Sequence, residues 1–378
     1  MDLTPTPEQK MLRDAAHKYL RAEYTFDARR QLIASETGMS AAHWCRFAEF
    51  GWLGLGLPEA RGGFGGMPDV VQVAEAMGAA LVVEPYLAST VLAGQAIAAA
   101  GNPTQCAALL PPLVSGGKIY TLAHTEADAG ADLAWVTTTA RLEAGHWVLS
   151  GRKTGVPAAP WVDAFVVAAR TAGAPGQRDG IGLFVVPGGA PGVRVDAYPR
   201  YDGARAGELQ LDGVAIGGEA ALGDPAAGLA ALERAVDLAT VAACADALGA
   251  MTAVLSKTGE YLATRRQFDA PLASFQVLQH RLVDMFAAIE ASRSLLLLAA
   301  LQGDNPVPAE RARAVSAAKV AIGERARYVA QQGVQLHGGV GMTEELDIGH
   351  YFRRLTLFQH AFGGIDHHLQ RFASLRNV

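Results

Sequence analysis

Cysteine is scarce in this chain of 378 residues, which contains only three. Cys45, Cys106 and Cys244 are odd in number, far apart and set in apolar surroundings. This pattern excludes a disulfide framework, and no pair has the spacing of metal ligands. We therefore expect three buried thiols in a reducing cytoplasm and no metal site.

Charge and long hydrophobic runs are also limited. Charged residues make up 18% of the chain, the formal net charge is −5, and no basic arm or stripe suggests a nucleic acid partner. The most apolar runs, such as residues 295–301, are too short to span a bilayer, and the N-terminus lacks the pattern of a secretion signal. Since half of the residues are hydrophobic, the chain can bury a large core in two or three domains. We expect a cytoplasmic protein that binds neither nucleic acid nor membrane.

Hydrophobic spacing divides the chain into three regions. Residues 1–117 repeat at helical spacing, beginning with a capping sequence at residues 6–9, and predict an N-terminal all-α domain. Residues 118–224 contain short β-branched runs, such as 135–139, between Gly, Pro and Asp turns, and predict a small, barrel-like β-domain. Residues 225–378 predict a C-terminal four-helix bundle, so the expected fold class is α+β. The helices expected in the bundle are 228–265, 275–302, 308–336 and 349–362.

Two segments of the last region have the composition of a binding site. Gly338 and Gly339 follow a long helical pattern, and adjacent glycines let backbone N–H groups approach a phosphate or sugar. A glycine helix cap followed by a loop would give the same pattern. Further upstream, Arg265 could pair with a diphosphate through two parallel hydrogen bonds, and Phe268 offers an apolar face to a flat ring.

These segments, R-R-Q-F-D-A-P-L with F-Q and Q-L-H-G-G-V-G, resemble the R-x-x-F-G-x-P-I/L…F-Q and Q-x-x-G-G-x-G segments of the flavin-dependent acyl-CoA dehydrogenase family. The first departs from the family at Asp269, where glycine is usual. A G-x-x-G-L-x-x-P-E…G-G-x-G pattern at residues 51–66 extends the resemblance toward the start of the chain. The resemblance implies that these residues bind the ADP half of an FAD whose isoalloxazine ring sits in a neighbouring subunit. The residues are Arg265, Phe268, Gln276, Gln335, Leu336, Gly338 and Gly339.

The predicted β-domain matches the family only in part. The loop that starts at His124 resembles the family's T-E-P-G-x-G-S-D loop, which makes Thr125 a candidate flavin contact, although a polar loop between two strands is an equally good reading. In the family's K-x-W-I-T/S strand, counted from Lys153, this chain has Gly155 and Pro157. Gly155 offers no ring to shield a flavin, and Pro157 has neither a hydroxyl nor an N–H to donate.

The family's catalytic glutamate is missing from both of its known positions. The C-terminal Y-E-G-T pattern is replaced by A-F-G-G, with Phe362 at the base position, and the alternative position on the first bundle helix holds Ala239. We therefore assign no catalytic residue to this chain. Displaced bases are conceivable at three aspartates, but we interpret these as a surface charge, a buried polar contact and a helix N-cap, in the order Asp237, Asp246 and Asp366. We interpret the C-terminal histidines as surface or interface residues, and they are His360, His367 and His368.

The chain keeps the groups it would lend to a neighbour's FAD and lacks groups it would need for its own. It resembles the small, base-lacking subunits of heteromeric acyl-CoA dehydrogenases, such as pimeloyl-CoA dehydrogenase small-subunit-like proteins. We expect FAD-dependent α,β-dehydrogenation of acyl-CoA thioesters by an α2β2 tetramer, with a homologous subunit supplying the glutamate and an electron-transfer flavoprotein as acceptor. The alternatives are a self-sufficient homo-oligomer with a displaced base and a non-catalytic scaffold subunit without FAD.

Overall fold

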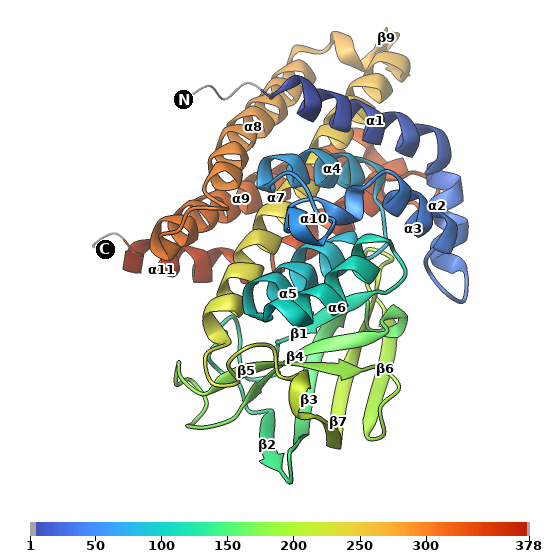
Figure 1. Cartoon of the computed structure of the whole chain (residues 1–378). Helices are drawn as coiled ribbons and strands as arrows, with labels where there is room; N and C mark the ends of the chain where they lie inside the picture. Colours follow the sequence, from blue (N-terminus) through green and yellow to red (C-terminus); the bar gives the residue numbers. More distant parts are fainter. Residues whose placement is uncertain (1–4, 376–378) are drawn as a thin grey trace. The chain divides into compact units, whose positions relative to one another are not determined.

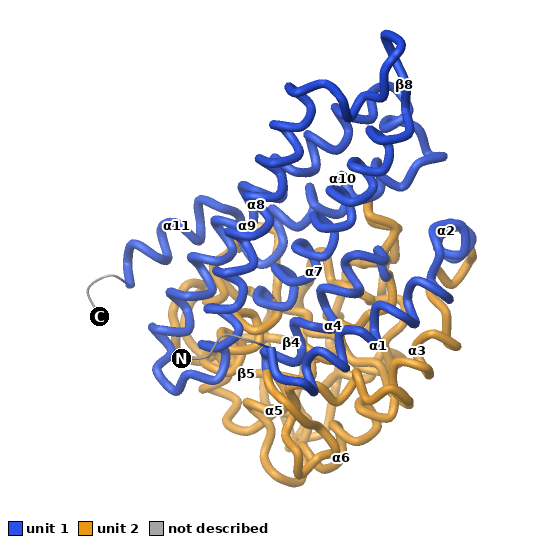
Figure 2. Tube along the Cα trace, turned by 90° about the horizontal axis from the view of Figure 1, so that it is seen from above, with its two compact units in different colours: residues 1–34, 67–82, 240–378 blue, residues 35–66, 83–239 orange. Residues whose placement is uncertain are grey.

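The computed structural model describes residues 5–375 as two compact units, which Figure 2 shows in different colours. Unit 1 comprises residues 1–34, 67–82 and 240–378, and unit 2 comprises residues 35–66 and 83–239. Each unit is assembled from segments that are far apart in the sequence. The mixture of long helices with one large sheet confirms the predicted α+β class (Figure 1).

Unit 1 is helical, and its long helices follow the predicted spans closely. Helix α1 begins with the predicted capping box, in which the side chains of Thr6 and Gln9 each accept a hydrogen bond from the other residue's backbone N–H. The predicted helix at 349–362 ends early, at Phe358, because residues 359–364 form a turn. The helices are α1 (Pro7–Glu23), α2 (Phe26–Ala34), α4 (Met67–Ala80), most of α7 (Leu229–Thr264), α8 (Gln276–Leu301), α9 (Pro308–His337), α10 (Ile348–Phe358) and α11 (Ile365–Ser374).

Two glycines bring the backbones of α4 and α7 together. A Cβ atom on Gly78 would lie 1.9 Å from the carbonyl oxygen of Asp246, and one on Gly249 would lie 1.8 Å from that of Glu75. Neither position can hold a larger residue without separating the helices. Both carbonyl-bearing residues also form ion pairs through their side chains, Glu75 with Arg293 at 2.8 Å and Asp246 with Arg354 at 2.7 Å. This junction ties a helix from early in the chain to the C-terminal helices.

Helix α7 is apolar and mostly buried. It is long and apolar enough to cross a membrane by length and composition alone, but 78% of its apolar window is buried inside the protein. A buried core helix meets the same criterion, so we interpret α7 as one. Its buried residues include Ala239, at 0% exposure.

Unit 2 contains a seven-stranded sheet with short helices beside it. The strand order is β1-β4-β2-β3-β7-β6, and β5 also pairs with β4. Inward-facing residues such as Phe165, Leu209 and Val214 make its apolar core. The strands are β1 (Tyr120–Ala123), β2 (Thr139–Glu143), β3 (His146–Pro157), β4 (Ala164–Arg170), β5 (Ile181–Pro187), β6 (Val193–Pro199) and β7 (Arg205–Gly217). The helices are α3 (Ala41–Glu49), the π-helical η3 (Leu87–Ala93), α5 (Gly94–Ala100) and α6 (Pro103–Val114).

The strand predicted at residues 135–139 is wrong for all but its last residue. Side chains bond to much of its backbone: the Arg170 guanidinium donates to the carbonyl of Val136, and the Glu126 carboxylate accepts the N–H groups of Thr137 and Thr138. The carbonyl of Thr138 accepts the backbone N–H of Arg170, the last residue of β4, at 2.7 Å. The Arg170 guanidinium donates to five carbonyl oxygens in all and is 5% exposed. Side-chain bonds to the backbone compete with the sheet ladder, so this β-branched run forms a loop.

Candidate functional site

The segment after α7 is a tight hairpin. Helix α7 ends at Thr264, and two short strands, β8 (Arg266–Gln267) and β9 (Ala270–Pro271), pair across a two-residue turn. The turn residues Phe268 and Asp269 have φ of 53° and 60°. Positive φ at both central residues defines the type I′ turn, for which glycine, asparagine and aspartate are the favoured residues. Asp269, which departs from the family's glycine, therefore suits its position.

The hairpin presents its side chains to solvent. Phe268 is 88% exposed, and its ring meets that of Phe275 edge-on, at 6.2 Å between ring centroids. Arg265 caps the end of α7, with its N–H bonded to the carbonyl of Tyr261, and its side chain is exposed. Val277, in the first turn of α8, is 61% exposed as well, and exposed apolar side chains that gather in one place mark interaction surfaces more often than single ones do. This end of the bundle has the composition of an incomplete site.

The glycine segment lies at the end of α9. Gly338 has φ of 64°, and a Cβ on either Gly338 or Gly339 would meet no atom within 4 Å. The backbone is therefore open on its outer side, as a ligand phosphate requires. Gln335 is exposed beside it, whereas the side chain of Leu336 is only 7% exposed and packs into the bundle. Only the backbone of Leu336 is available to a ligand.

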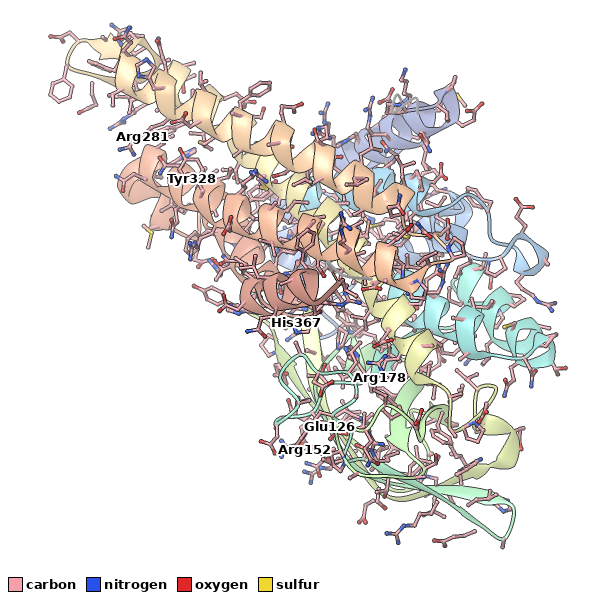
Figure 3. All side chains as sticks on the ribbon, turned by 90° about the vertical axis from the view of Figure 1, so that its left-hand side faces the viewer. Glu126, Arg152, Arg178, Arg281, Tyr328 and His367 are labelled. Carbon is pink, nitrogen blue, oxygen red and sulfur yellow. The ribbon has the colours of Figure 1, made fainter. Side chains whose placement is uncertain are left out.

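The ends of α7, α8 and α9 meet, which brings the two predicted segments together. The rings of Tyr261 and His337 stack at 4.5 Å, joining the last turn of α7 to that of α9. Arg281, near the start of α8, donates to Gln332 on α9 at 3.2 Å. Figure 3 shows Arg281 and Tyr328 on neighbouring helices near the hairpin. Gln276 begins α8 and is exposed at the same end.

These residues fit one half of an FAD site. An exposed guanidinium, an exposed ring and an open glycine backbone are the groups that bind a diphosphate and a flat base. Val340 and Met342, 39% and 76% exposed, add apolar surface beside the glycines. We propose Arg265, Phe268, Gln276, Gln335 and the backbone of residues 336–339 as the groups that hold the ADP half.

A buried ion pair in the sheet was not anticipated from the sequence. Lys153 on β3 is 0% exposed, and its Nζ lies 2.7 Å from Oε1 of Glu126, which is 5% exposed. Glu126 also accepts both the N–H and the hydroxyl of Thr137 and of Thr138. Figure 3 shows Glu126 beside the sheet. Glu126 and Lys153 each stand in a polar stretch, His124–Asp128 and Ser150–Gly155, so the sequence around them carries no signal of burial or pairing.

This pair locks the loop that carries Thr125 onto β3. Burial alone would raise the pKa of Glu126, but the Lys153 ammonium and the threonine hydrogen bonds lower it to about 2. The carbonyl of Thr125 accepts the N–H of Thr154 at 2.9 Å, so loop and strand are bonded at adjacent points. Thr125 is thus held rigidly by its neighbours, whether or not it touches a flavin.

The ionised carboxylate makes the folded protein sensitive to acid. The folded-state pKa of Glu126 lies near 2, below its ordinary value of 4.5, so the unfolded chain binds this proton first as the pH falls. Stability present above pH 4.5 is therefore lost between about pH 4.5 and 2. We expect Glu126→Gln to lower the melting temperature at pH 7 and to flatten its pH dependence in that window. Melting temperatures of the wild type and Glu126→Gln that fall in parallel as the pH is lowered would contradict this prediction.

In β3, the strand that the family resemblance places against a flavin, the N–H donor of Gly155 is already used and Pro157 has none. β3 bulges against β7 between Lys153 and Val156, and Gly155 in the bulge has φ of 60°. The N–H of Gly155 is donated to Glu208 at 3.2 Å, and Pro157 has no N–H to donate. Glu208 also pairs with Arg152 at 3.4 Å.

The turn at residues 359–364 contains Phe362, which stands at the C-terminal position of the family's catalytic glutamate. Phe362 is half-buried and has φ of 57°, and its carbonyl accepts a hydrogen bond from His368 Nε2 at 3.0 Å. His368 is 1% exposed, so its interpretation as a surface or interface residue is wrong. Burial lowers its pKa to about 3, and the neutral ring accepts from Ser316 through Nδ1. Lys319 also supports the turn, donating to the carbonyls of residues 358 and 359.

The burial and contacts of several other side chains also differ from the predictions. Asp237 is 1% exposed, not a surface charge, and Cys45 is exposed, not buried. Asp246 is bonded to Arg354 through both oxygens, which confirms the polar contact. Asp366 lies in the first turn of α11, but Gly364 is the N-cap. Among the described residues, no cluster of three metal-ligating side chains occurs.

Comparisons with known proteins identify the family. The chain matches the N-terminal, middle and C-terminal domains of acyl-CoA dehydrogenases over residues 6–117, 121–214 and 226–374. The acyl-CoA dehydrogenase FadE27 of Mycobacterium tuberculosis is 31% identical over 384 residues, covering 98% of this chain and 97% of that protein. The chain therefore belongs to the acyl-CoA dehydrogenase family, flavin-dependent oxidoreductases that act on CH–CH bonds and use FAD.

Two solved structures are similar along their whole length. The Tcur3481-Tcur3483 steroid ACAD, in its G363A variant, is 32% identical with a TM-score of 0.88, and each chain covers 98% of the other. The ChsE4-ChsE5 complex of Mycobacterium tuberculosis is 30% identical with a TM-score of 0.87, covering 99% of this chain and 98% of that one. Both similarities extend through all three domains of the family.

Proposed function

We propose that this chain is one subunit of a hetero-oligomeric acyl-CoA dehydrogenase, in which a homologous subunit supplies the catalytic glutamate. One observation carries the proposal. The groups that would hold the ADP half of FAD are exposed together at one end of the bundle, while Phe362 and Ala239 occupy the two base positions. Neither phenylalanine nor alanine can accept the α-proton of a thioester.

The β-domain supports the same division of labour. The backbone donor at Gly155 is committed to Glu208, and Pro157 offers none, so β3 has little to donate to a flavin ring. Two of the three aspartates considered as displaced bases are accounted for by the structure, since Asp246 is held by Arg354 and Asp237 is buried in α7. The resemblance to the two-protein ChsE4-ChsE5 complex adds support for two related subunits.

In this assembly the chain binds and positions FAD, and it transfers no proton. Arg265 would neutralise the diphosphate, Phe268 would cover the flat base, and the glycine backbone of residues 338–339 would donate to phosphate or ribose oxygens. When bound, FAD supplies the acceptor for the hydride that leaves the β-carbon of the thioester. We propose an α2β2 tetramer in the cytoplasm that oxidises acyl-CoA and passes its electrons to an electron-transfer flavoprotein.

A visible absorption spectrum tests the proposal. The purified chain alone should be colourless or weakly coloured, and co-purification with a homologous subunit should give a yellow, active complex. Yellow protein that is active alone would identify a self-sufficient homo-oligomer. Colourless protein in both preparations would identify a scaffold subunit without FAD.

Replacement of Phe362 tests whether the position at which the family has its catalytic glutamate takes part in catalysis in this chain. Phe362→Ala removes a half-buried ring from a turn whose conformation is set by the carbonyl bond to His368. Since no proton moves at this position, the turnover of the complex should stay within about threefold of the wild type, a barrier change of less than about 1 kcal/mol. A drop of about a thousandfold with the fold intact, roughly 4 kcal/mol, would show that the position takes part in catalysis.

A further inference from the structure

The helix that leads into α5 has an unusual start. Residues 86–100 are spaced as one ordinary helix, but Leu87–Ala93 form the π-helical segment η3. Such turns are rare and often lie at functional sites, because they shift side chains out of α-helical register. η3 packs against β1, an edge strand of the sheet, where Ser89 Oγ accepts the N–H of Tyr120 at 3.2 Å.

Three polar atoms around this junction are buried without a hydrogen-bond partner. They are the hydroxyl of Tyr86, Oγ1 of Thr90 and Nδ1 of His124. Tyr86 is 2% exposed and Thr90 is 0% exposed, and they lie about one helical turn apart. His124 directly follows β1, and strand alternation puts it on the face of Tyr120 and Leu122. Buried polar groups without partners are costly, so a group of three on two packed elements indicates groups kept for a ligand.

A third unpartnered hydroxyl belongs to a different environment. Thr121 Oγ1 is also buried without a partner, but Thr121 alternates with Tyr120 and Leu122. It lies on the face of Ala123, which belongs to the apolar core of the sheet. We therefore leave Thr121 out of the group formed by Tyr86, Thr90 and His124.

The group is polar but carries no positive charge. Burial lowers the pKa of His124 to about 4, so its ring is neutral at pH 7. The nearest lysine on β3, Lys153, is already paired with Glu126. Glu84, two residues before Tyr86, is itself a carboxylate that is 5% exposed. The cation that acts on His124, Lys153, is already paired with Glu126, so a carboxylate ligand would lack a counter-charge of its own, and a plain hydrocarbon would leave three polar groups unsatisfied.

We propose that Tyr86, Thr90 and His124 bind a neutral oxygen function, a hydroxyl or a ketone, on the acyl group of the CoA thioester. Two hydroxyls can donate to that oxygen, and the imidazole nitrogen can accept from a ligand hydroxyl. The inference rests on the proposed function and narrows its substrate class. It favours an oxygenated acyl group over a hydrocarbon chain or a dicarboxylic acid.

Stability measurements test whether the hydroxyls are unpartnered. Thr90→Val and Tyr86→Phe remove hydroxyls with almost no change of shape, and Ser89→Ala is the matched control because its hydroxyl is bonded to Tyr120. In the assembled complex without thioester, the first two should melt at or above the wild-type temperature, and Ser89→Ala should melt below it. If all three variants lose stability equally, the hydroxyls have partners in the free protein and the inference fails.

Binding measurements test the substrate class. The probes are octanoyl-CoA, hydroxyoctanoyl-CoA isomers with the hydroxyl at each carbon from 4 to 8, and suberyl-CoA, titrated calorimetrically into the assembled complex. At least one hydroxy isomer should bind about tenfold or more tightly than octanoyl-CoA, since it satisfies groups that octanoyl-CoA leaves unpaired. Thr90→Val and Tyr86→Phe should abolish this preference, and Ser89→Ala should keep it.

The outcomes separate this inference from the proposed function. If octanoyl-CoA binds but no hydroxy isomer is preferred, or if suberyl-CoA binds most tightly, only the oxygen site is wrong. A preference that survives in both the Thr90→Val and the Tyr86→Phe variants would also overturn it. If no thioester binds to the complex at all, the proposed function itself fails.

Discussion

Replacing Arg265 with alanine should weaken retention of FAD by roughly thirtyfold or more. The exposed Arg265 side chain stands at the end of α7, beside the hairpin, where we place the diphosphate. Removing one partner of a charge-assisted contact at an interface costs about 2–5 kcal/mol, and each 1.4 kcal/mol is tenfold in affinity. Arg265→Lys should recover only part of the loss, because lysine keeps the charge but lacks the planar fork.

The measurement is FAD content after dilution of the assembled complex. The neighbouring Arg266 is a poor control, because it lies in β8 and donates to the carbonyl of Asp269 in the turn. Arg141→Ala, an exposed arginine on β2, is the better control and should retain FAD fully. If Arg265→Ala retains FAD as well as Arg141→Ala does, the shared-cofactor proposal fails at its central residue.

Replacing Lys153 with methionine should produce the largest loss of stability. The ammonium is 0% exposed and bonded to Glu126 at 2.7 Å, so its removal leaves an ionised carboxylate buried without a counter-charge. Breaking a buried pair from one side costs about 3–5 kcal/mol. The threonine hydrogen bonds to Glu126 remain and keep the cost within this range. The loss should appear as a lower midpoint in thermal and urea unfolding.

A matched surface pair provides the control. Lys118 bonds Asp163 at 2.6 Å, but its side chain is 50% exposed. Solvent screens such a pair, so Lys118→Met should cost no more than about 1 kcal/mol. Equal losses for Lys118→Met and Lys153→Met would mean that burial of the Glu126 pair has no special consequence. The loop carrying Thr125 should also lose amide protection from hydrogen exchange in the Lys153 variant only.

Long-range partners account for what the sequence did not predict in unit 2. Glu126 and Lys153 are separated by 27 positions, and the loop at residues 135–138 is set by Glu126 and Arg170 rather than by its own β-branched composition. β-propensity describes only how a residue suits a pleated surface, and a buried charge that takes backbone groups outweighs it. Similarly, η3 departs from helical register at a place where periodicity predicts an ordinary helix.

The amino-acid sequence by itself determined the α+β class, the spans of the long helices and the two motifs of the proposed FAD site. These properties depend on neighbours within a few positions, as in the capping box at Thr6, or on short motifs that carry their own turn chemistry. Only the tertiary structure decided that His368 is buried against the turn at Phe362, that Lys153 is neutralised by Glu126, and that the Tyr86 and Thr90 hydroxyls lack partners. The physical reason is that burial and pairing are set by which distant segments pack together, and no local pattern encodes the partner of a buried polar group.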